Sequence, residues 1–306
     1  MNNISGKRIS RKTAVRHFNI VGTLLTVYTL FVLVIPFVFH YYLVSTDSYI
    51  LKDTFLYFGI YFLVVVFGTV IPFWLMRQFF KIPLRLINTK IKTAFVNLFV
   101  QTIVFFTICI VSTYVSNILF AHFGLEGKLI SGIGLSYDAG YLDNLLYVFM
   151  LVIVTPMIEE YAFRGVLLSV LGKYGKNFGL YASAVVFAFA HVHFAEYLPA
   201  FCMGVLLGKT ALRYRSIGPT IIIHILFNAL IYSLCVIPSS IAGYMAYGLA
   251  GVFIISIYLY ISGRYERVYV QKLNSASNTY LLFFSCFMVI LSLMLMILQT
   301  VFSILI

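Results

Sequence analysis

The sequence predicts an all-α protein: a polytopic membrane helical bundle of about nine transmembrane helices with a cytoplasmic N-terminus. Three observations support this fold class. First, 62% of the 306 residues are hydrophobic and only 10% are charged, whereas soluble domains carry about 25% charged residues. Second, apolar stretches of about 20 residues, the length that crosses a bilayer, recur along the chain. They lack the short alternating pattern of outer-membrane barrel strands.

The third observation is the position of the basic residues, because cytoplasmic loops of membrane proteins are enriched in Lys and Arg. With the N-terminus inside, 18 of the 21 basic residues fall in cytoplasmic segments, Lys52 and Lys128 fall outside, and Arg164 lies within a span. This distribution accounts for the net charge of +12 without nucleic acid as a partner. It predicts a multi-pass protein of the cell membrane. The expected spans are residues 20–43, 54–76, 94–120, 143–171, 177–195, 197–213, 217–237, 242–262 and 279–305.

These spans divide the chain into three expected regions. Residues 1–142 form a three-span region with a basic cytoplasmic tail and loop, 143–237 form a core, and 238–306 form a two-span C-terminal region. In the core, Gly204 and Gly208 have the G-x-x-x-G spacing that predicts close helix packing. The four cysteines are dispersed through apolar runs without a C-x-x-C pair, which is typical of small buried hydrophobes.

The first informative polar cluster lies in the fourth span, where a charge at mid-bilayer costs roughly 2.5–3.5 kcal/mol and is functional by default. Glu160 and Arg164 are four residues apart, so they share a helix face and can pair. Glu159 is offset by about 100° and points elsewhere. Pro156, one turn upstream, removes a backbone hydrogen bond and predicts a bend near the two acids.

Two further polar pairs lie in the fifth and seventh spans. Phe187 and His191 form an F-x-x-x-H pattern, and His224 and Asn228 form an H-x-x-x-N pattern. Alone, the first is typical of a satisfied core histidine and the second of a helix–helix hydrogen bond. At about 1.5 Å rise per residue, however, these groups and Glu159 fall in one band between mid-membrane and the cytoplasm. This favours a shared polar cavity that opens toward the cytoplasm.

Such a cavity has the groups that hydrolysis of an amide bond requires. A carboxylate beside a histidine can take a proton from water. A second histidine and an amide can donate to the oxyanion that forms on the attacked carbonyl. The spans contain neither the G-x-S-x-G of a serine hydrolase nor an H-E-x-x-H zinc helix. The residues therefore predict a hydrolase that activates water directly.

The ordered set E-E-x-x-x-R, F-x-x-x-H and H-x-x-x-N on successive apolar helices resembles the CPBP (Abi) family of CAAX proteases and bacteriocin-processing or immunity proteins. Its best-known branch is the type II CAAX prenyl endopeptidase. The resemblance covers about 143–237 and implies an intramembrane endopeptidase with an all-helical core. It implies that Glu159 and His191 activate the water and that His224 and Asn228 form the oxyanion site.

The resemblance also implies supporting roles for Glu160, Arg164 and Phe187, the first two as a pair and the third packed near the site. It implies a membrane-associated substrate within the lipid bilayer, either a CAAX-type protein or a bacterial peptide such as a bacteriocin or pheromone. Because a composition rich in Ile, Phe and Tyr that also uses Lys and Asn is typical of a low-GC bacterium, we favour a peptide or protein that is not prenylated. No cofactor is expected.

Three alternatives stay open at this point. Two His and two Glu could ligate zinc or iron in a metal-dependent membrane protease, although Arg164 would repel a cation. The chain could instead be a non-catalytic scaffold that regulates a partner membrane protein. Buried Glu and His also form the proton relays of transporters, although the sequence lacks the duplicated halves typical of them.

Overall fold

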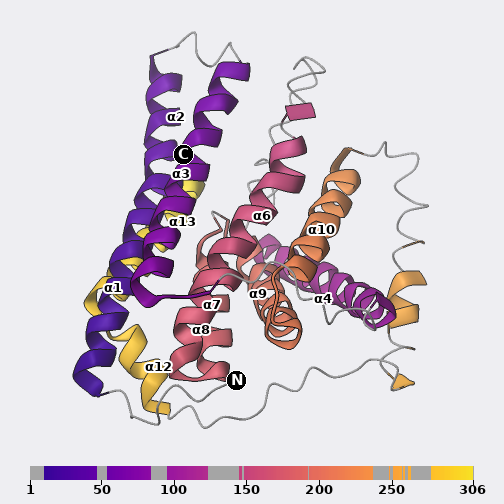
Figure 1. Cartoon of the computed structure of the whole chain (residues 1–306). Helices are drawn as coiled ribbons and strands as arrows, with labels where there is room; N and C mark the ends of the chain where they lie inside the picture. Colours follow the sequence, from indigo (N-terminus) through magenta and orange to yellow (C-terminus); the bar gives the residue numbers. More distant parts are fainter. Residues whose placement is uncertain are drawn as a thin grey trace.

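The computed structural model describes residues 10–46, 54–83, 95–122, 145–146, 148–191, 193–236, 248, 251–256, 258, 261–262 and 277–305. Every regular element in these residues is a helix, which confirms the all-α prediction (Figure 1). The expected domain boundaries at 142/143 and 237/238, and most of the expected span 242–262, lie outside the described residues.

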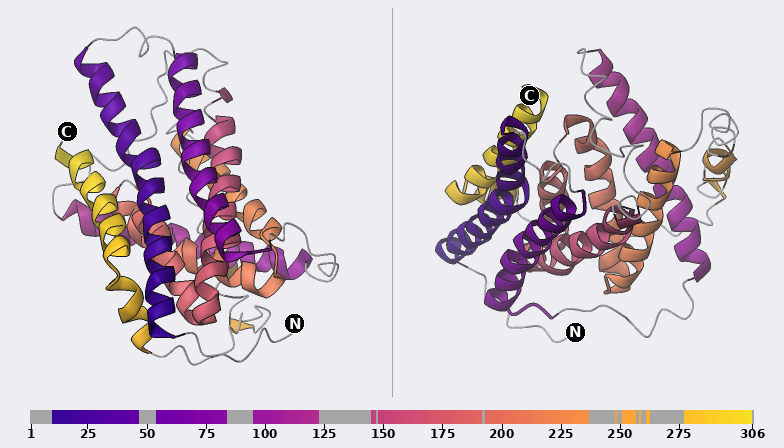
Figure 2. Two further views of the ribbon diagram at one scale, coloured as in Figure 1. Left: turned by 60° about the vertical axis from the view of Figure 1, so that its left-hand side comes forward. Right: turned by 90° about the horizontal axis from the view of Figure 1, so that it is seen from above.

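The N-terminal helices are α1 (Arg11–Thr29), η1 (Leu30–Val34), α2 (Ile35–Ser45), α3 (Thr54–Phe80) and α4 (Phe95–Ala121). The first three follow one another as a single rod, which begins where the Ser10 side chain accepts a hydrogen bond from the backbone N–H of Thr13. α3 packs beside this rod. α4 lies across the bundle and packs on α9, as the two views of Figure 2 show.

The central helices are η5 (Met150–Val154), α6 (Thr155–Glu159), η6 (Glu160–Leu167), α7 (Leu168–Leu171), η7 (Gly172–Tyr174), α8 (Lys176–Phe189), α9 (Phe194–Tyr214) and α10 (Gly218–Val236). The expected continuous span 143–171 contains two π-helical segments, η5 and η6. α8 is shorter than the expected span 177–195, because it ends at Phe189.

The close packing predicted from the G-x-x-x-G spacing is confirmed between α8 and α9. A Cβ atom on Gly204 would lie 2.9 Å from Ala184, and one on Gly208 would lie 2.6 Å from the side chain of Leu180. A larger residue at Gly204 would push the two helices apart, because it would meet the Ala184 backbone, whereas one at Gly208 would displace the Leu180 side chain. α8 and α9 therefore form a rigid hairpin beside the segment that carries the two glutamates.

The last expected span, 279–305, is not one straight helix. It breaks into α12 (Ser277–Phe284) and α13 (Phe287–Leu305), bent by 66°. The break is supported by α1: Asn19 Oδ1 accepts the backbone N–H of Met288 at 3.3 Å. Gly22 lets the two backbones meet, since a Cβ there would lie 2.5 Å from the Met288 carbonyl carbon. Contacts from a distant helix therefore replace the backbone bonds lost at the break.

Among the described helices, three are long and apolar enough to cross a membrane: Arg11–Ser45, Phe62–Phe80 and Gln101–Ala121. The bent pair α12–α13 would be a fourth if it crosses as one span. These helices support a membrane protein. The count of nine spans stays a prediction.

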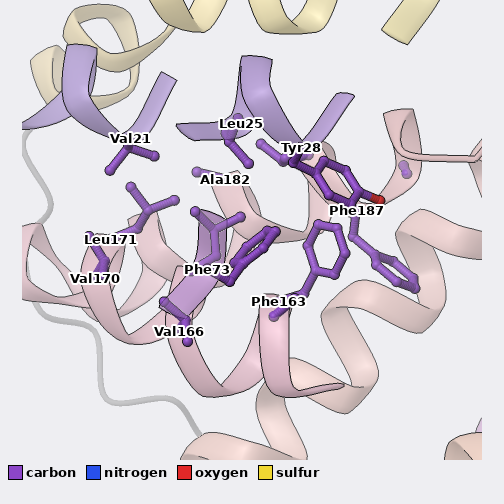
Figure 3. Packing of buried hydrophobic residues seen from close by; sticks show 14 of the residues in the cluster. Val21, Leu25, Tyr28, Phe73, Phe163, Val166, Val170, Leu171, Ala182 and Phe187 are labelled. Atoms are coloured by element: carbon purple, nitrogen blue, oxygen red, sulfur yellow. The ribbon is translucent and has the colours of Figure 1, made fainter. Parts of the chain in front are cut away.

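The core lies where α1, α3, the η6–α7 segment and α8 meet (Figure 3). Tyr28 of α1 and Phe73 of α3 contact Phe163 of η6 at ring-centroid distances of 6.0 and 5.5 Å. Phe163 in turn contacts Phe187 of α8 at 5.0 Å. This row of rings packs η6 against α1, α3 and α8, so the core directly supports the helix that carries the glutamates.

Candidate active site

The polar centre of the structure is a buried network of three side chains from two helices. Glu160 Oε1 lies 2.8 Å from Arg164 Nη1 and 2.9 Å from His224 Nδ1. The Glu160 side chain is 0% exposed and that of Arg164 is 2% exposed. The predicted ion pair is therefore present, with His224 of α10 as a further partner. Because ionised groups this deeply buried require such partners, the network holds η6 and α10 together.

Glu159 stands at the edge of this network. Its Oε2 atom is 3.7 Å from His224 Nε2, and its side chain is 26% exposed. That separation is longer than a direct hydrogen bond of about 2.7–3.2 Å. His224 thus lies between the two adjacent glutamates, bonded to the buried one and facing the partly exposed one. The two neighbouring carboxylates occupy different environments because successive helical residues point about 100° apart, so that Glu160 is buried while Glu159 is partly exposed.

Phe187 of α8 forms the wall beside the network. The Arg164 guanidinium carbon lies 4.0 Å from the centroid of its ring, a cation–π distance. The His224 ring is 6.3 Å away in an edge-to-face arrangement. The position of Phe187 near the site agrees with the expectation from the resemblance.

His191 lies just beyond the C-terminal end of α8 rather than on its helical face. Its backbone N–H donates to the Ala188 carbonyl at 3.1 Å, and its Nδ1 is 2.9 Å from the Phe187 carbonyl oxygen. Its ring contacts the Phe187 ring at 4.9 Å. Phe187 is thus the side chain through which His191 joins the network. The expectation that His191 lies within a helical span, 177–195, is wrong, because α8 ends at Phe189.

Asn228 lies one turn after His224 on α10. Its Nδ2 donates to the backbone carbonyl oxygen of Leu151, in the π-helix η5, at 3.0 Å. The sequence predicts that Asn228 and His224 address the same cavity; in the structure, His224 contacts Glu160 of η6 and Asn228 contacts Leu151 of η5. Nothing in the sequence pattern indicated that a backbone carbonyl would be the partner.

The arrangement does not fit a divalent cation at Glu160. Oε1 of Glu160 already faces the Arg164 guanidinium and the His224 ring, and the positive charge of Arg164 opposes a cation beside this carboxylate. No group of three or more His, Cys, Asp or Glu side chains with metal-binding geometry occurs in the described part of the chain. We therefore derive no step through a metal ion.

Sequence reasoning brought the polar residues together but overlooked two features of their surroundings. One is Phe163, which lies between Phe187 and the N-terminal helices. The other is the carbonyl of Leu151. An aromatic residue in an apolar helix carries no distinctive signal, and a backbone acceptor carries none unless the helix type is known.

Comparison with known protein families gives a match. Residues 141–230 match the model of the family described as Type II CAAX prenyl endopeptidase Rce1-like. Comparisons with curated proteins and with solved structures found no match. The matched range contains all seven residues that the motifs singled out, from Glu159 to Asn228. Residues 141–230 are therefore similar to the Rce1-like domain of type II CAAX prenyl endopeptidases, as the motifs predicted.

Proposed function

We propose that the protein is an intramembrane endopeptidase that hydrolyses a peptide bond of a membrane-associated protein or peptide. The observation that carries the proposal is His224 held between two unlike glutamates within a domain of this family. The long apolar helices support a substrate that reaches the site from the bilayer. The distribution of basic residues supports a site that opens toward the cytoplasm.

Glu159 is the group best placed to act as general base. It is partly exposed, whereas Glu160 is sealed between Arg164 and His224. In the proposed step Glu159 takes a proton from water as the water oxygen attacks the scissile carbonyl carbon. The C–N bond then breaks, and the proton passes from Glu159 to the leaving amine. General base catalysis of this kind contributes about 10²–10⁴-fold to a rate. His191, as the resemblance implies, would help to orient the water.

His224 is the proposed oxyanion donor. The role requires both ring nitrogens to be protonated. Nδ1 then donates to Glu160, and the Nε2 N–H faces the gap beside Glu159, where the carbonyl oxygen of the substrate would develop charge. Removing one such donor costs about 10²–10³-fold in kcat. The resemblance implies Asn228 as a second donor. Because Asn228 Nδ2 is bonded to Leu151, our proposal gives the oxyanion role to His224.

The substrate could be a CAAX-type protein or a bacterial peptide such as a bacteriocin precursor or pheromone. The family match supports a protease with a membrane-associated substrate. The composition favours the bacterial peptide. A library that contains prenylated CAAX peptides, their unprenylated forms and short hydrophobic peptides would separate these cases by the cleavage products.

The test is cleavage of that library by the purified full chain in lipid nanodiscs, read by mass spectrometry. Wild type is compared with Glu159→Gln, His191→Ala and His224→Ala, with and without a chelator. Glu196→Gln serves as the matched control, since Glu196 is a partly buried glutamate of the same domain in the first turn of α9.

We expect the Glu159 and His224 variants to lose at least about 10²-fold in rate, whereas the control and the chelated wild type retain theirs. Cleavage by Glu159→Gln at the wild-type rate would contradict the proposed base. Loss with chelator and recovery with one specific metal would support the metal-dependent alternative. A wild type without cleavage activity, together with three variants that keep full function in cells, would favour the scaffold.

A further inference from the structure

The backbone just before Pro156 has a carbonyl that its own helix cannot satisfy. η5 is a π-helix, and at its end the N–H of Thr155 donates to the carbonyl of Met150, five residues earlier. The next bond in that register would join residue 156 to the carbonyl of Leu151. Residue 156 is a proline and has no N–H to donate. The Leu151 carbonyl therefore has no donor at residue 156, where a π-helix would supply one. The donor that an α-helix would supply, the N–H of Thr155, is already bonded to Met150.

Asn228 supplies the missing donor from another helix. Its Nδ2 lies 3.0 Å from the Leu151 carbonyl oxygen, although the two residues are 77 positions apart in sequence. Within a bilayer an unpaired backbone carbonyl is costly, and proline is tolerated in spans because side chains of neighbouring helices pair with the freed groups. The bond from Asn228 therefore pairs the carbonyl that Pro156 leaves without a backbone donor.

We propose that Asn228 is a positioning residue, whose amide replaces the backbone donor that Pro156 lacks and thereby fixes α10 against the segment that carries Glu159 and Glu160. α10 is then held by two polar bonds one turn apart, Asn228 to Leu151 and His224 to Glu160. One bond alone would leave α10 free to rotate about it. Two bonds fix both its distance and its rotation, and so set the 3.7 Å gap between His224 and Glu159.

A second copy of the same backbone pattern provides a control. η1 ends with the N–H of Ile35 donating to the carbonyl of Leu30, and Pro36 follows. The spacing between the π-helix and its proline is identical at the two places. Pro36 lies in the N-terminal rod, outside the Rce1-like domain. A change there alters the same kind of backbone break without involving Asn228.

The first experiment is a stability cycle on the full chain in lipid nanodiscs. It compares the melting temperatures of wild type, Asn228→Leu, Pro156→Ala and the double variant. Asn228→Leu should lower the melting temperature by about 2–4 °C. Pro156→Ala returns an N–H to the backbone, so the double variant should recover most of that loss. The pair Asn228→Leu and Pro36→Ala should show no recovery. If the Asn228→Leu protein does not accumulate in the membrane, the milder Asn228→Ser takes its place in every comparison of the cycle.

A loss from Asn228→Leu that is equally large in the wild-type and Pro156→Ala backgrounds would overturn the proposal. So would a recovery of equal size with Pro36→Ala. This cycle needs no substrate, so its failure is distinct from failure of the proposed protease activity.

The second experiment tests positioning rather than stability alone, and it rests on the proposed function. Displacement of catalytic groups by about 1 Å can cost about 10²-fold in rate. We therefore expect Asn228→Leu to lower kcat with little change in KM, and Pro156→Ala to restore kcat about tenfold in the double variant. Recovery of the melting temperature without recovery of kcat would show that the bond is structural and would overturn the positioning role.

Discussion

The buried Glu160–Arg164 pair gives the sharpest prediction about stability. We consider Arg164→Met and Glu160→Gln, which each remove one charge and keep most of the side-chain volume. Both side chains are almost fully buried, and their charged atoms are 2.8 Å apart. Removing one partner of a buried pair costs about 3–5 kcal/mol, because the other charge stays buried without compensation. The Arg164 change also removes the contact with Phe187 at 4.0 Å, worth about 0.5–2 kcal/mol.

The double variant, with both Arg164→Met and Glu160→Gln, should be more stable than either single variant. It has no buried charge left in the pair, and replacing both members of a buried pair is often neutral or stabilising. We expect each single variant to lose on the order of 10 °C in melting temperature and the double variant to lose much less. His224 keeps a polar partner in Gln at position 160, since the amide oxygen can still accept its Nδ1 proton.

The assay is thermal unfolding in detergent, read with a thiol-reactive fluorophore. Cys109 and Cys286 are buried, so they react only as the helices separate. Single variants that melt within about 2 °C of wild type would refute the reasoning. A double variant whose loss equals the sum of the two single losses would also refute it, because the pair would then have no coupling energy.

Two further predictions concern the N-terminal helix α1. Gly22→Ala should destabilise the protein by about 1–3 kcal/mol, because the new Cβ would lie 2.5 Å from the Met288 backbone. Gly59→Ala, at an open position, is the control. Equal melting temperatures of the two variants would contradict the close crossing of α1 and α13 at Gly22. Tyr174→Phe should cost about 1 kcal/mol, because it removes the hydroxyl that lies 2.5 Å from His17 Nδ1. A melting temperature unchanged by the substitution would show that this bond is not net stabilising.

The sequence predicted those contacts that depend on local periodicity. The Glu160–Arg164 pair follows from four-residue spacing on one helix, and the G-x-x-x-G packing follows from two glycines on one face. The contact between His224 and Glu160 was not predicted, because the sequence placed His224 in a shared cavity with Glu159 and paired Glu160 only with Arg164. Helix periodicity places a residue on a face but does not say which of two adjacent carboxylates a residue 64 positions away will meet.

The features that sequence analysis missed depend on helix type and on distant partners. The break between α12 and α13 contains neither proline nor glycine, and its support comes from Asn19, 269 residues away. The pairing of Asn228 with Leu151 depends on the π-helical register before Pro156, which the hydrophobic pattern does not encode. A proline in a span predicts a freed carbonyl but not the side chain that pairs with it.

The regions outside residues 141–230 also contribute to the candidate site. Phe163 lies three positions after Glu160 and is packed by Tyr28 of α1 and Phe73 of α3, both outside the family match. α10 holds the same segment from its polar side through His224. The helix with the glutamates is therefore clamped between a row of aromatic rings and a pair of hydrogen bonds. Loosening either side would shift Glu159 relative to His224, so the N-terminal helices support the geometry of the site even though they supply none of its polar groups.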